Sequence, residues 1–317
     1  MQRYILHRLL QAVVVLFLVS LVVFVMLHVL PGGAGRAILG KSATPLQVAQ
    51  FDHRMGYDRP IPVQYWTWLT QVLRGDLGFS YKLNQPVSAV LGQALPKTAL
   101  LTAISIAVAL LIAIPLGLLQ AVRRNKPADH IGTGVAFVLY ATPTFFLALA
   151  LVLIFGVDLR LLPAEAPQTN SIPAILGSFQ GMILPVASLA LGMVALFSRY
   201  LRSSILDNLA EDWVRTARAK GLPPRRILVR HVLRNSLTSM VTLLGLSVPW
   251  VLAGSVIVEQ VFNYPGMGLL FWNEAQVNDF PVELAVVLVV GVATVAGNLL
   301  ADIGYALLDP RVRYGRS

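Results

Sequence analysis

Residues that could perform covalent or metal chemistry are scarce in this chain and lie far apart. It contains no cysteine, which excludes disulfides, thiolate metal sites and cysteine nucleophiles. The five histidines form no H-x-x-x-H pair, so a metal site within one segment is not expected; they are His7, His28, His53, His130 and His231. The sequence also lacks the G-x-x-x-x-G-K-[ST] loop that cradles nucleotide phosphates. It therefore predicts no catalytic residue, no metal and no cofactor bound by this chain.

The remaining chemistry is that of a charged segment, residues 199–235, which is rich in Arg and Lys. Asp207–Lys220 is predicted to form one helix, which Gly221 ends because glycine suits the C′ position and the following prolines cannot continue a helix. Arg225–Asn235 is predicted to form a second helix, so that the pair makes an elbow. Small residues such as Ala217 would let another chain approach the backbone. Two interpretations stay open: a docking element for a soluble partner, or a basic helix pair lying on anionic headgroups.

Composition and apolar runs indicate that this elbow belongs to a membrane protein. Apolar residues make up 56% of the chain and charged residues 13%, against about 25% charged in a soluble domain. Six stretches could cross about 30 Å of hydrocarbon, which needs about 20 apolar residues. They are Leu9–Leu30, Thr98–Val122, Ile131–Val157, Gly181–Ser198, Leu237–Val258 and about Leu284–Leu308. The predicted fold is all-α and polytopic, and the net charge of +10 is assigned to contact with lipid headgroups, not to nucleic acid.

The loops indicate the organisation and the orientation. Residues 1–30 are expected to form the N-terminus and an uncleaved first span, 31–97 an extracytoplasmic segment, 98–308 the membrane core with the elbow at 199–235, and 309–317 a tail. Short loops rich in Arg and Lys alternate with loops that carry almost none, so the positive-inside rule places both termini in the cytoplasm. Basic residues in 31–97 do not change this, because long loops translocate largely regardless of charge.

The extracytoplasmic segment is too long for a simple turn. Thr44–Arg54 is predicted to be a short helix with Thr44 as its N-cap, and Ile61–Arg74 a second helix that carries two tryptophans. These tryptophans suit a membrane interface or a subunit contact. The whole segment is either a small packed cap on the outer face or a docking surface or outer gate.

Ionisable groups within the spans are nearly absent. Asp302 lies in the last span close to its end, where an interfacial residue or an ion pair with a nearby Arg is expected. Glu259, at the outer end of the fifth span, is a candidate outer gate, with a structural ion pair to a basic residue of the outer segment as the alternative. The absence of a buried carboxylate or histidine relay argues against a proton-driven transporter. Four prolines are expected to bend their spans and are Pro115, Pro143, Pro185 and Pro249.

The elbow is also where the sequence resembles a known family. Val214–Leu222, which reads VRTARAKGL, and Arg230–Asn235, which reads RHVLRN, resemble the cytoplasmic EAA loop of binding-protein-dependent ABC importer permeases. The similarity is greatest to the dipeptide, oligopeptide and nickel branch. Further stretches resemble that branch, in the same order along the chain: Arg3–Leu10, Tyr57–Tyr65, Arg74–Gly78, Val258–Phe262, Pro265–Gly268 and Asp279–Val282. The resemblance covers nearly the whole chain, and the combination is specific.

The elbow departs from the general EAA pattern. The Glu-Ala-Ala position reads Arg215–Ala217 here, and the terminal I-x-L-P reads His231–Arg234. Only Ala217, Gly221 and Leu233 match the broad consensus. These departures are themselves typical of the peptide branch, so they narrow the subfamily, and no role can be given to the missing glutamate.

The resemblance implies a type I ABC importer permease fold with a large extracytoplasmic region after the first span. It implies peptide transport across the bacterial plasma (inner) membrane by alternating access. The implied partners are a second homologous permease chain, two cytoplasmic ATPase subunits or domains that would bind ATP and Mg, and an extracytoplasmic substrate-binding protein. The residues implied to couple to the ATPase are Arg215, Thr216, Ala217, Arg218, Ala219, Lys220, Gly221 and Leu222.

Other functions stay open at this stage. The same machinery could carry nickel chelates, haem or another small solute, because selectivity would reside mainly in the binding protein. A secondary transporter is the alternative from a different class, although it would need intramembrane ionisable groups or inverted repeats. An intramembrane enzyme would need a nucleophile and a base within the spans, and His28 has no such partner in sequence.

Overall fold

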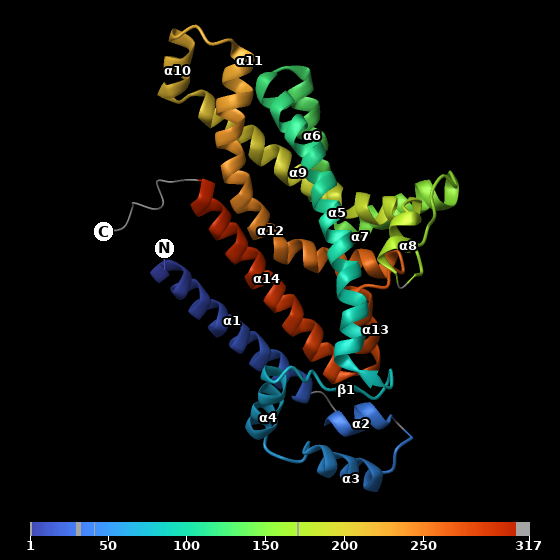
Figure 1. The fold of residues 1–317 in the computed structure, drawn as a ribbon. Helices are drawn as coiled ribbons and strands as arrows, with labels where there is room; N and C mark the ends of the chain where they lie inside the picture. The colour runs from blue at the N-terminus through green and yellow to red at the C-terminus, as the bar shows by residue number, and fades with distance from the viewer. Residues whose placement is uncertain (1, 30–32, 41, 170, 309–317) are drawn as a thin grey trace. The chain divides into compact units, whose positions relative to one another are not determined.

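The computed structural model describes residues 2–29, 33–40, 42–169 and 171–308, and nearly all of its regular structure is helical (Figure 1). Leu30, the tail 309–317 and the side chain of Asp302 lie outside this description. Two compact units divide the chain. Unit 1 comprises Met1–Thr98 with Pro265–Val295, and unit 2 comprises Ala99–Tyr264 with Ala296–Ser317.

Unit 1 contains the first predicted span and the described part of the segment predicted to be extracytoplasmic. Its complete elements are α1 (Gln2–Val29), α2 (Gly33–Leu39), α3 (Pro45–Met55), α4 (Ile61–Leu73), the strands β1 (Phe79–Ser80) and β2 (Gln85–Pro86), and α13 (Met267–Val277). The strands pair antiparallel, Phe79 with Pro86 and Ser80 with Gln85. Helices α5 (Val87–Val122) and α14 (Phe280–Leu308) each contribute residues to both units.

The two helices predicted in the extracytoplasmic segment are confirmed, with bounds within a residue. Thr44 caps α3 through a full capping box: its hydroxyl accepts from the N–H of Gln47 at 3.3 Å, and the Gln47 amide oxygen accepts from the N–H of Thr44 at 2.8 Å. Gly56 ends the helix with a φ of +73°, the left-handed conformation that glycine adopts without cost. Local sequence chemistry therefore sets both ends of α3.

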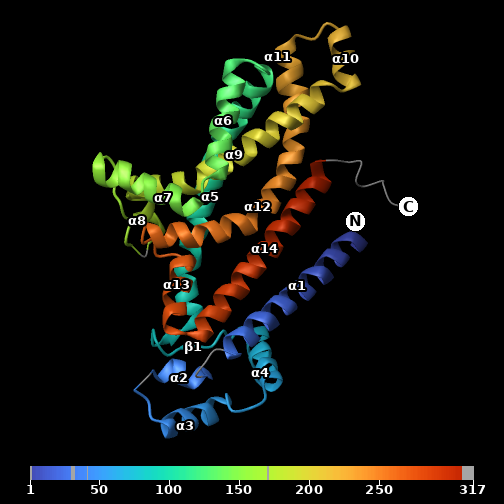
Figure 2. The ribbon, with the colours of Figure 1, turned by 180° about the vertical axis from the view of Figure 1, so that it is seen from behind.

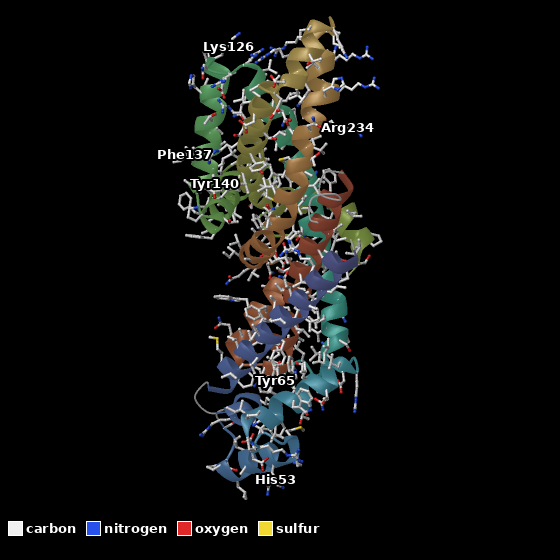
Figure 3. The ribbon with its side chains drawn as sticks, turned by 90° about the vertical axis from the view of Figure 1, so that its left-hand side faces the viewer. His53, Tyr65, Lys126, Phe137, Tyr140 and Arg234 are labelled. Atoms are coloured by element: carbon white, nitrogen blue, oxygen red, sulfur yellow. The ribbon has the colours of Figure 1, made fainter. Side chains whose placement is uncertain are left out.

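An aromatic cluster holds α4 against α1 within unit 1. Tyr65 is buried, and its ring lies edge-on to Phe24 of α1, with ring centres 5.3 Å apart. Its hydroxyl shares a 2.9 Å hydrogen bond with Ser20, so both ends of the side chain are satisfied. Trp68 joins the cluster with its ring centre 5.6 Å from that of Phe24. This packing supports the interpretation of the segment as a structured cap (Figure 3).

Unit 2 is built around one buried helix. Its complete elements are α6 (Pro127–Ala141), α7 (Thr144–Leu151), the π-helix η1 (Val152–Asp158), α8 (Ile172–Gly177), α9 (Gln180–Leu209), α10 (Asp212–Ala219), α11 (Pro224–Arg226), the π-helix η2 (Ile227–Val232) and α12 (Leu233–Val261). In the most apolar stretch of α9, 72% of the residues are buried, whereas in that of α5 only 22% are buried. Met193, Phe197 and Leu201 of α9 are fully buried. Helix α9 therefore forms the core, and α5 leaves most of its apolar surface for lipid or another chain.

The described residues contain five helices long and apolar enough to cross a membrane, or six if one bent pair counts as a span. The third predicted span, Ile131–Val157, is wrong as a continuous helix: α6 and the α7–η1 segment meet at 103°. The break falls at Thr142, whose φ and ψ of −77° and 124° are extended. Pro143 explains this, because the residue before a proline is disfavoured in the helical region. Pro115 and Pro185, by contrast, lie within continuous helices.

Candidate coupling site and outer face

The charged segment does form an elbow, with one correction to its first helix. Asp207–Lys220 is not a single helix, because α9 continues to Leu209 and α10 begins only at Asp212. Glu211 between them is extended, with a ψ of 147°. The chain then turns and returns through α11 and η2 into α12. Figures 1 and 2 show α10 and α11 side by side at one end of α9 and α12.

Gly221 closes α10 with a Schellman motif. The N–H of Leu222 donates to the carbonyl of Ala217 at 3.2 Å, and the N–H of Gly221 donates to that of Arg218 at 2.9 Å. Gly221 has a φ of +76° and is exposed. A Cβ built there would have nothing within 4 Å. Glycine is therefore favoured by the backbone of this chain, and the space beside it is open.

The residues of the elbow divide into an inner and an outer set. Val214 is 1% exposed, and Ala217 and Leu222 are half-buried against the core of unit 2. The outer set is exposed and consists of Arg215, Thr216, Arg218, Ala219, Lys220 and Gly221. Ala217, whose small size was expected to admit a partner, is half-buried and packs in part against its own chain. The outer set is the more exposed part of the elbow.

A buried ion pair fastens the helix that leads into the elbow. The Asp129 carboxylate, at the start of α6, accepts from Nε and Nη2 of Arg202 on α9 at 2.6 and 2.7 Å. It also accepts from the N–H of Asn125 at 2.9 Å. The Asp129 side chain is 3% exposed and that of Arg202 26%. Sequence reasoning missed this pair, although an acid at the edge of an apolar helix was a usable signal.

Glu259, the candidate outer gate, lies near the end of α12 and is fully buried. The N–H of Tyr264 donates to the Glu259 carbonyl at 2.8 Å. The Tyr264 side chain is also fully buried, and this burial, followed by the nearby Glu259 charge, raises the pKa of its phenol. A second backbone hydrogen bond is accepted close by in the sequence: the N–H of Ala166 donates to the Phe262 carbonyl at 2.8 Å. The described conformation therefore holds Glu259 in packed protein.

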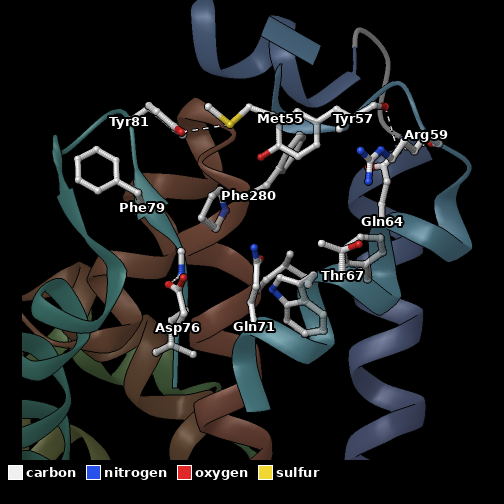
Figure 4. A pocket seen from close by; sticks show the side chains of 17 residues that line it. Met55, Tyr57, Arg59, Gln64, Thr67, Gln71, Asp76, Phe79, Tyr81 and Phe280 are labelled. Atoms are coloured by element: carbon white, nitrogen blue, oxygen red, sulfur yellow. Dashed lines mark hydrogen bonds between the residues drawn. The ribbon is translucent and has the colours of Figure 1, made fainter. Parts of the chain in front are cut away.

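Unit 1 contains a pocket of about 250 Å³ between the segment after α1 and the start of α14 (Figure 4). Aromatic rings of Tyr57, Phe79, Tyr81 and Phe280 line it, together with the Arg59 guanidinium. Burial is the largest cause that raises the pKa of Tyr57, to about 12. The pocket is closed on one side by the turn that follows α4, where the Asp76 carboxylate accepts from the N–H of Gly78 at 2.9 Å. Both segments that resembled the family, Tyr57–Tyr65 and Arg74–Gly78, thus contribute residues to the lining of this pocket.

Three acids gather beside this turn in unit 1. Glu274, Asp279 and Glu283 are 6%, 1% and 6% exposed. The Ser80 hydroxyl donates to the Asp279 carboxylate. Burial, followed by the Asp279 charge, raises the pKa of Glu274. The three acids are neighbours in the sequence, since the N–H of Asp279 donates to the Glu274 carbonyl and the N–H of Glu283 donates to the Asp279 carbonyl, both at 3.0 Å. Their burial beside Ser80, which is 199 positions from Asp279, was not predicted because it depends on long-range packing.

Comparisons with known proteins identify the family. The family described as "Binding-protein-dependent transport system inner membrane component" matches residues 113–314, and its N-terminal counterpart matches residues 1–102. This chain belongs to that family. It is therefore a membrane permease subunit of an ABC importer, not an enzyme, and ATP hydrolysis takes place in separate subunits.

Relatives align over almost the entire length. A putative peptide permease protein of Brucella ovis is 38% identical, over 99% of both chains. The glutathione transport system permease protein GsiC of Salmonella choleraesuis and the oligopeptide transport system permease protein AppB of Bacillus subtilis are each 37% identical, over 99% of this permease and 100% of the relative. The recognition of the peptide branch from its motifs is confirmed.

A solved structure agrees with the fold. A chain of the MetNI methionine ABC transporter, in an inward-facing crystal form, superposes with a TM-score of 0.54 at 17% identity. The match covers 68% of this permease and 96% of that chain. The predicted type I permease fold is confirmed.

Proposed function

We propose that this permease imports di- or oligopeptides, which a substrate-binding protein delivers, and that it does so paired with a second homologous permease chain. The names of the relatives support a peptide cargo: peptide, oligopeptide and glutathione, which is itself a tripeptide. Nickel chelates, haem and other small solutes are the alternatives that a transport assay must separate. One structural observation supports the coupling role, namely the exposed outer set of the elbow.

The elbow offers a mechanical link to an ATPase. The outer set, Arg215 to Gly221 without Ala217, would sit in a groove of the ATPase. Ala217 and Leu222 hold α10 on the core of unit 2, so displacement of the elbow must carry α9 and α12 with it. Closure of two ATPases on ATP would then tilt these helices and switch access between the two sides of the membrane, as a rigid-body two-state motion.

Substitutions at Gly221 test this proposal. Gly221→Ala carries the cost of a left-handed φ, about 1–2 kcal/mol, but adds little volume. Gly221→Trp carries a comparable backbone cost and fills the open space that surrounds the glycine. We expect Gly221→Trp to abolish peptide uptake and the ATPase stimulation by peptide-loaded binding protein, and Gly221→Ala to retain most of both. Both variants should reach the abundance of the parent protein.

Peptide uptake and ATPase stimulation together test the coupling to an ATPase separately from the identity of the cargo. Full coupling in Gly221→Trp, at normal abundance, would refute the docking of Gly221 on the ATPase. A complex that assembles with its ATPase but responds to no peptide would support the docking of the elbow and would refute the peptide cargo. The assay requires the intact complex in lipid, with loaded and unloaded binding protein compared.

The orientation is proposed to place both termini in the cytoplasm. The absence of cysteine makes this directly testable, because a single introduced thiol can be labelled without background. Arg74 and Arg124 are both exposed arginines, in the extracytoplasmic segment and in the α5–α6 turn. We expect a membrane-impermeant maleimide to label Arg74→Cys in intact cells, and Arg124→Cys only after lysis. The reverse pattern would invert the topology.

Glu259 is retained as a candidate gate residue, with a structural role as the alternative. Its complete burial favours the structural role in the conformation described here. A Glu259→Gln variant distinguishes them: a gate residue would impair uptake in an assembled complex, whereas a structural residue would reduce assembly itself.

A further inference from the structure

A basic pocket of about 300 Å³ lies at the base of the elbow in unit 2. Its lining is Trp213 from α10 and Arg230, His231, Arg234 and Asn235 from η2 and the start of α12. Counted from Arg230, the other three helix residues follow at one, four and five positions, so all four occupy one face of a helix. Figure 3 labels Arg234 near the start of α12.

No described residue balances the charge of this pocket. None of the five residues that line it is acidic. Among the residues that the structure describes, no carboxylate pairs with Arg230, His231 or Arg234. The nearest acid in sequence to Trp213, Asp212, lies 3.6 Å from Arg215 instead. The pocket therefore presents several hydrogen-bond donors and at least two full positive charges to whatever enters it.

The depth of the pocket relative to the membrane favours one kind of anion. The expected fifth span begins at Leu237, three residues after Arg234, which is about 4–5 Å along a helix. The headgroup layer on each side of the hydrocarbon is about 5–8 Å thick. Arg234 therefore lies at the level of lipid phosphates, and His231, six residues or about 9 Å before Leu237, lies at the outer edge of that layer. Trp213 is half-buried, and tryptophan is the side chain most typical of this interface.

The two ends of the elbow differ in this respect. Helix α10 leads from Trp213 at the base to Gly221 at the tip, and the chain returns from the tip through α11 and η2, which rise by roughly 13 Å between Pro224 and Val232. The tip is thus placed for a soluble partner, while the base is placed for the bilayer. The two interpretations of the segment, docking element and headgroup binder, apply to different ends of it.

We propose that the pocket binds the phosphate of an anionic phospholipid, such as phosphatidylglycerol. Two arginines can grip phosphate oxygens through their planar forks, and basic pockets on the cytoplasmic side of membrane helices suit such headgroups. Asn235 and His231 supply further donors, and the Trp213 ring covers the glycerol region. The bound lipid anchors the base of the elbow and leaves its tip free to follow a partner. This site does not depend on the cargo or on the docking of Gly221.

The test measures lipid binding to the full-length permease in nonionic detergent by native mass spectrometry. Phosphatidylglycerol is titrated beside phosphatidylcholine with the same acyl chains. The pocket variant is Arg230→Gln with Arg234→Gln. The matched control is Arg225→Gln with Arg226→Gln, which removes the same charge from exposed positions of the same loop. Each basic residue near an anionic surface contributes about fivefold in affinity, so the pocket variant should bind phosphatidylglycerol about 30-fold more weakly.

The expected result is a preference for phosphatidylglycerol that the pocket variant loses and the control variant keeps within about twofold, at unchanged melting temperature. Equal losses in both variants would overturn the site in favour of diffuse surface charge. Competition by millimolar inorganic phosphate, without lipid preference, would assign the pocket to a free anion. Unchanged lipid binding with loss of ATPase co-purification would assign it to an acidic protein segment, which would also overturn the proposal.

Discussion

Substitution of Asp129 by asparagine should destabilise the permease through the ion pair that fastens α6 to α9. The carboxylate accepts two hydrogen bonds from Arg202, at 2.6 and 2.7 Å, and a third from the Asn125 N–H. Asn125 has a φ of +62°, so the same carboxylate also fixes the left-handed turn before α6. Asparagine has nearly the same shape, but it has no charge and only one acceptor oxygen.

The magnitude follows from burial. Removal of one partner from a buried pair costs about 3–5 kcal/mol, because the other charge is left uncompensated. Arg202 is 26% exposed, so water relieves part of this, and asparagine keeps one hydrogen bond. We therefore expect a loss of about 2–3 kcal/mol, which corresponds to a fall in melting temperature of roughly 5–10 °C for a chain of this size.

The assay is thermal unfolding of the purified permease followed by size-exclusion fluorescence. Asp212→Asn is the matched control, since the Asp212–Arg215 pair spans 3.6 Å with side chains 92% and 82% exposed. Exposed pairs contribute about 0–1 kcal/mol, so its melting temperature should be nearly unchanged. Arg202→Lys, which keeps the charge but loses the planar fork, should fall between the two. A melting temperature of Asp129→Asn equal to that of the control would refute the reasoning.

Two further substitutions address the outer acids and the helix contacts. Glu274→Gln should raise the melting temperature at neutral pH: burial raises the pKa of Glu274, so the folded state prefers the protonated carboxyl, and the stability of the parent should decline as pH rises above about 4.3. A parent and variant with the same pH profile between about 4 and 7 would contradict this assignment. Gly117→Ala should lower the melting temperature, because its Cβ would lie 2.8 Å from the Ser198 carbonyl oxygen on α9, whereas Gly134→Ala, with nothing within 4 Å, should be neutral or stabilising. Equal melting temperatures for the two alanine variants would show that α5 and α9 do not approach this closely.

Local rules were sufficient for the elements that depend on neighbouring residues. Runs of apolar residues predicted the spans, and Thr44 and Gly221 predicted a helix start and a helix end that the structure confirms. The family was recognisable for a related reason, since its motifs are contiguous stretches such as Val214–Leu222. The same local reasoning failed at Pro143, where a proline and the residue before it broke a span that its apolar composition made look continuous.

The sequence by itself determined that this protein is a polytopic helical permease of the peptide branch, because hydrophobicity, caps and contiguous motifs are properties of adjacent residues. Only the tertiary structure decided which side of the elbow is exposed, that Asp129 pairs with Arg202, and that Asp279 is buried against Ser80. Each of these depends on which helices pack together, and residues 73 positions apart, as in that ion pair, leave no local pattern. Side-chain burial depends on the fold as a whole, so the exposed and the buried residues of the elbow became distinct only in three dimensions.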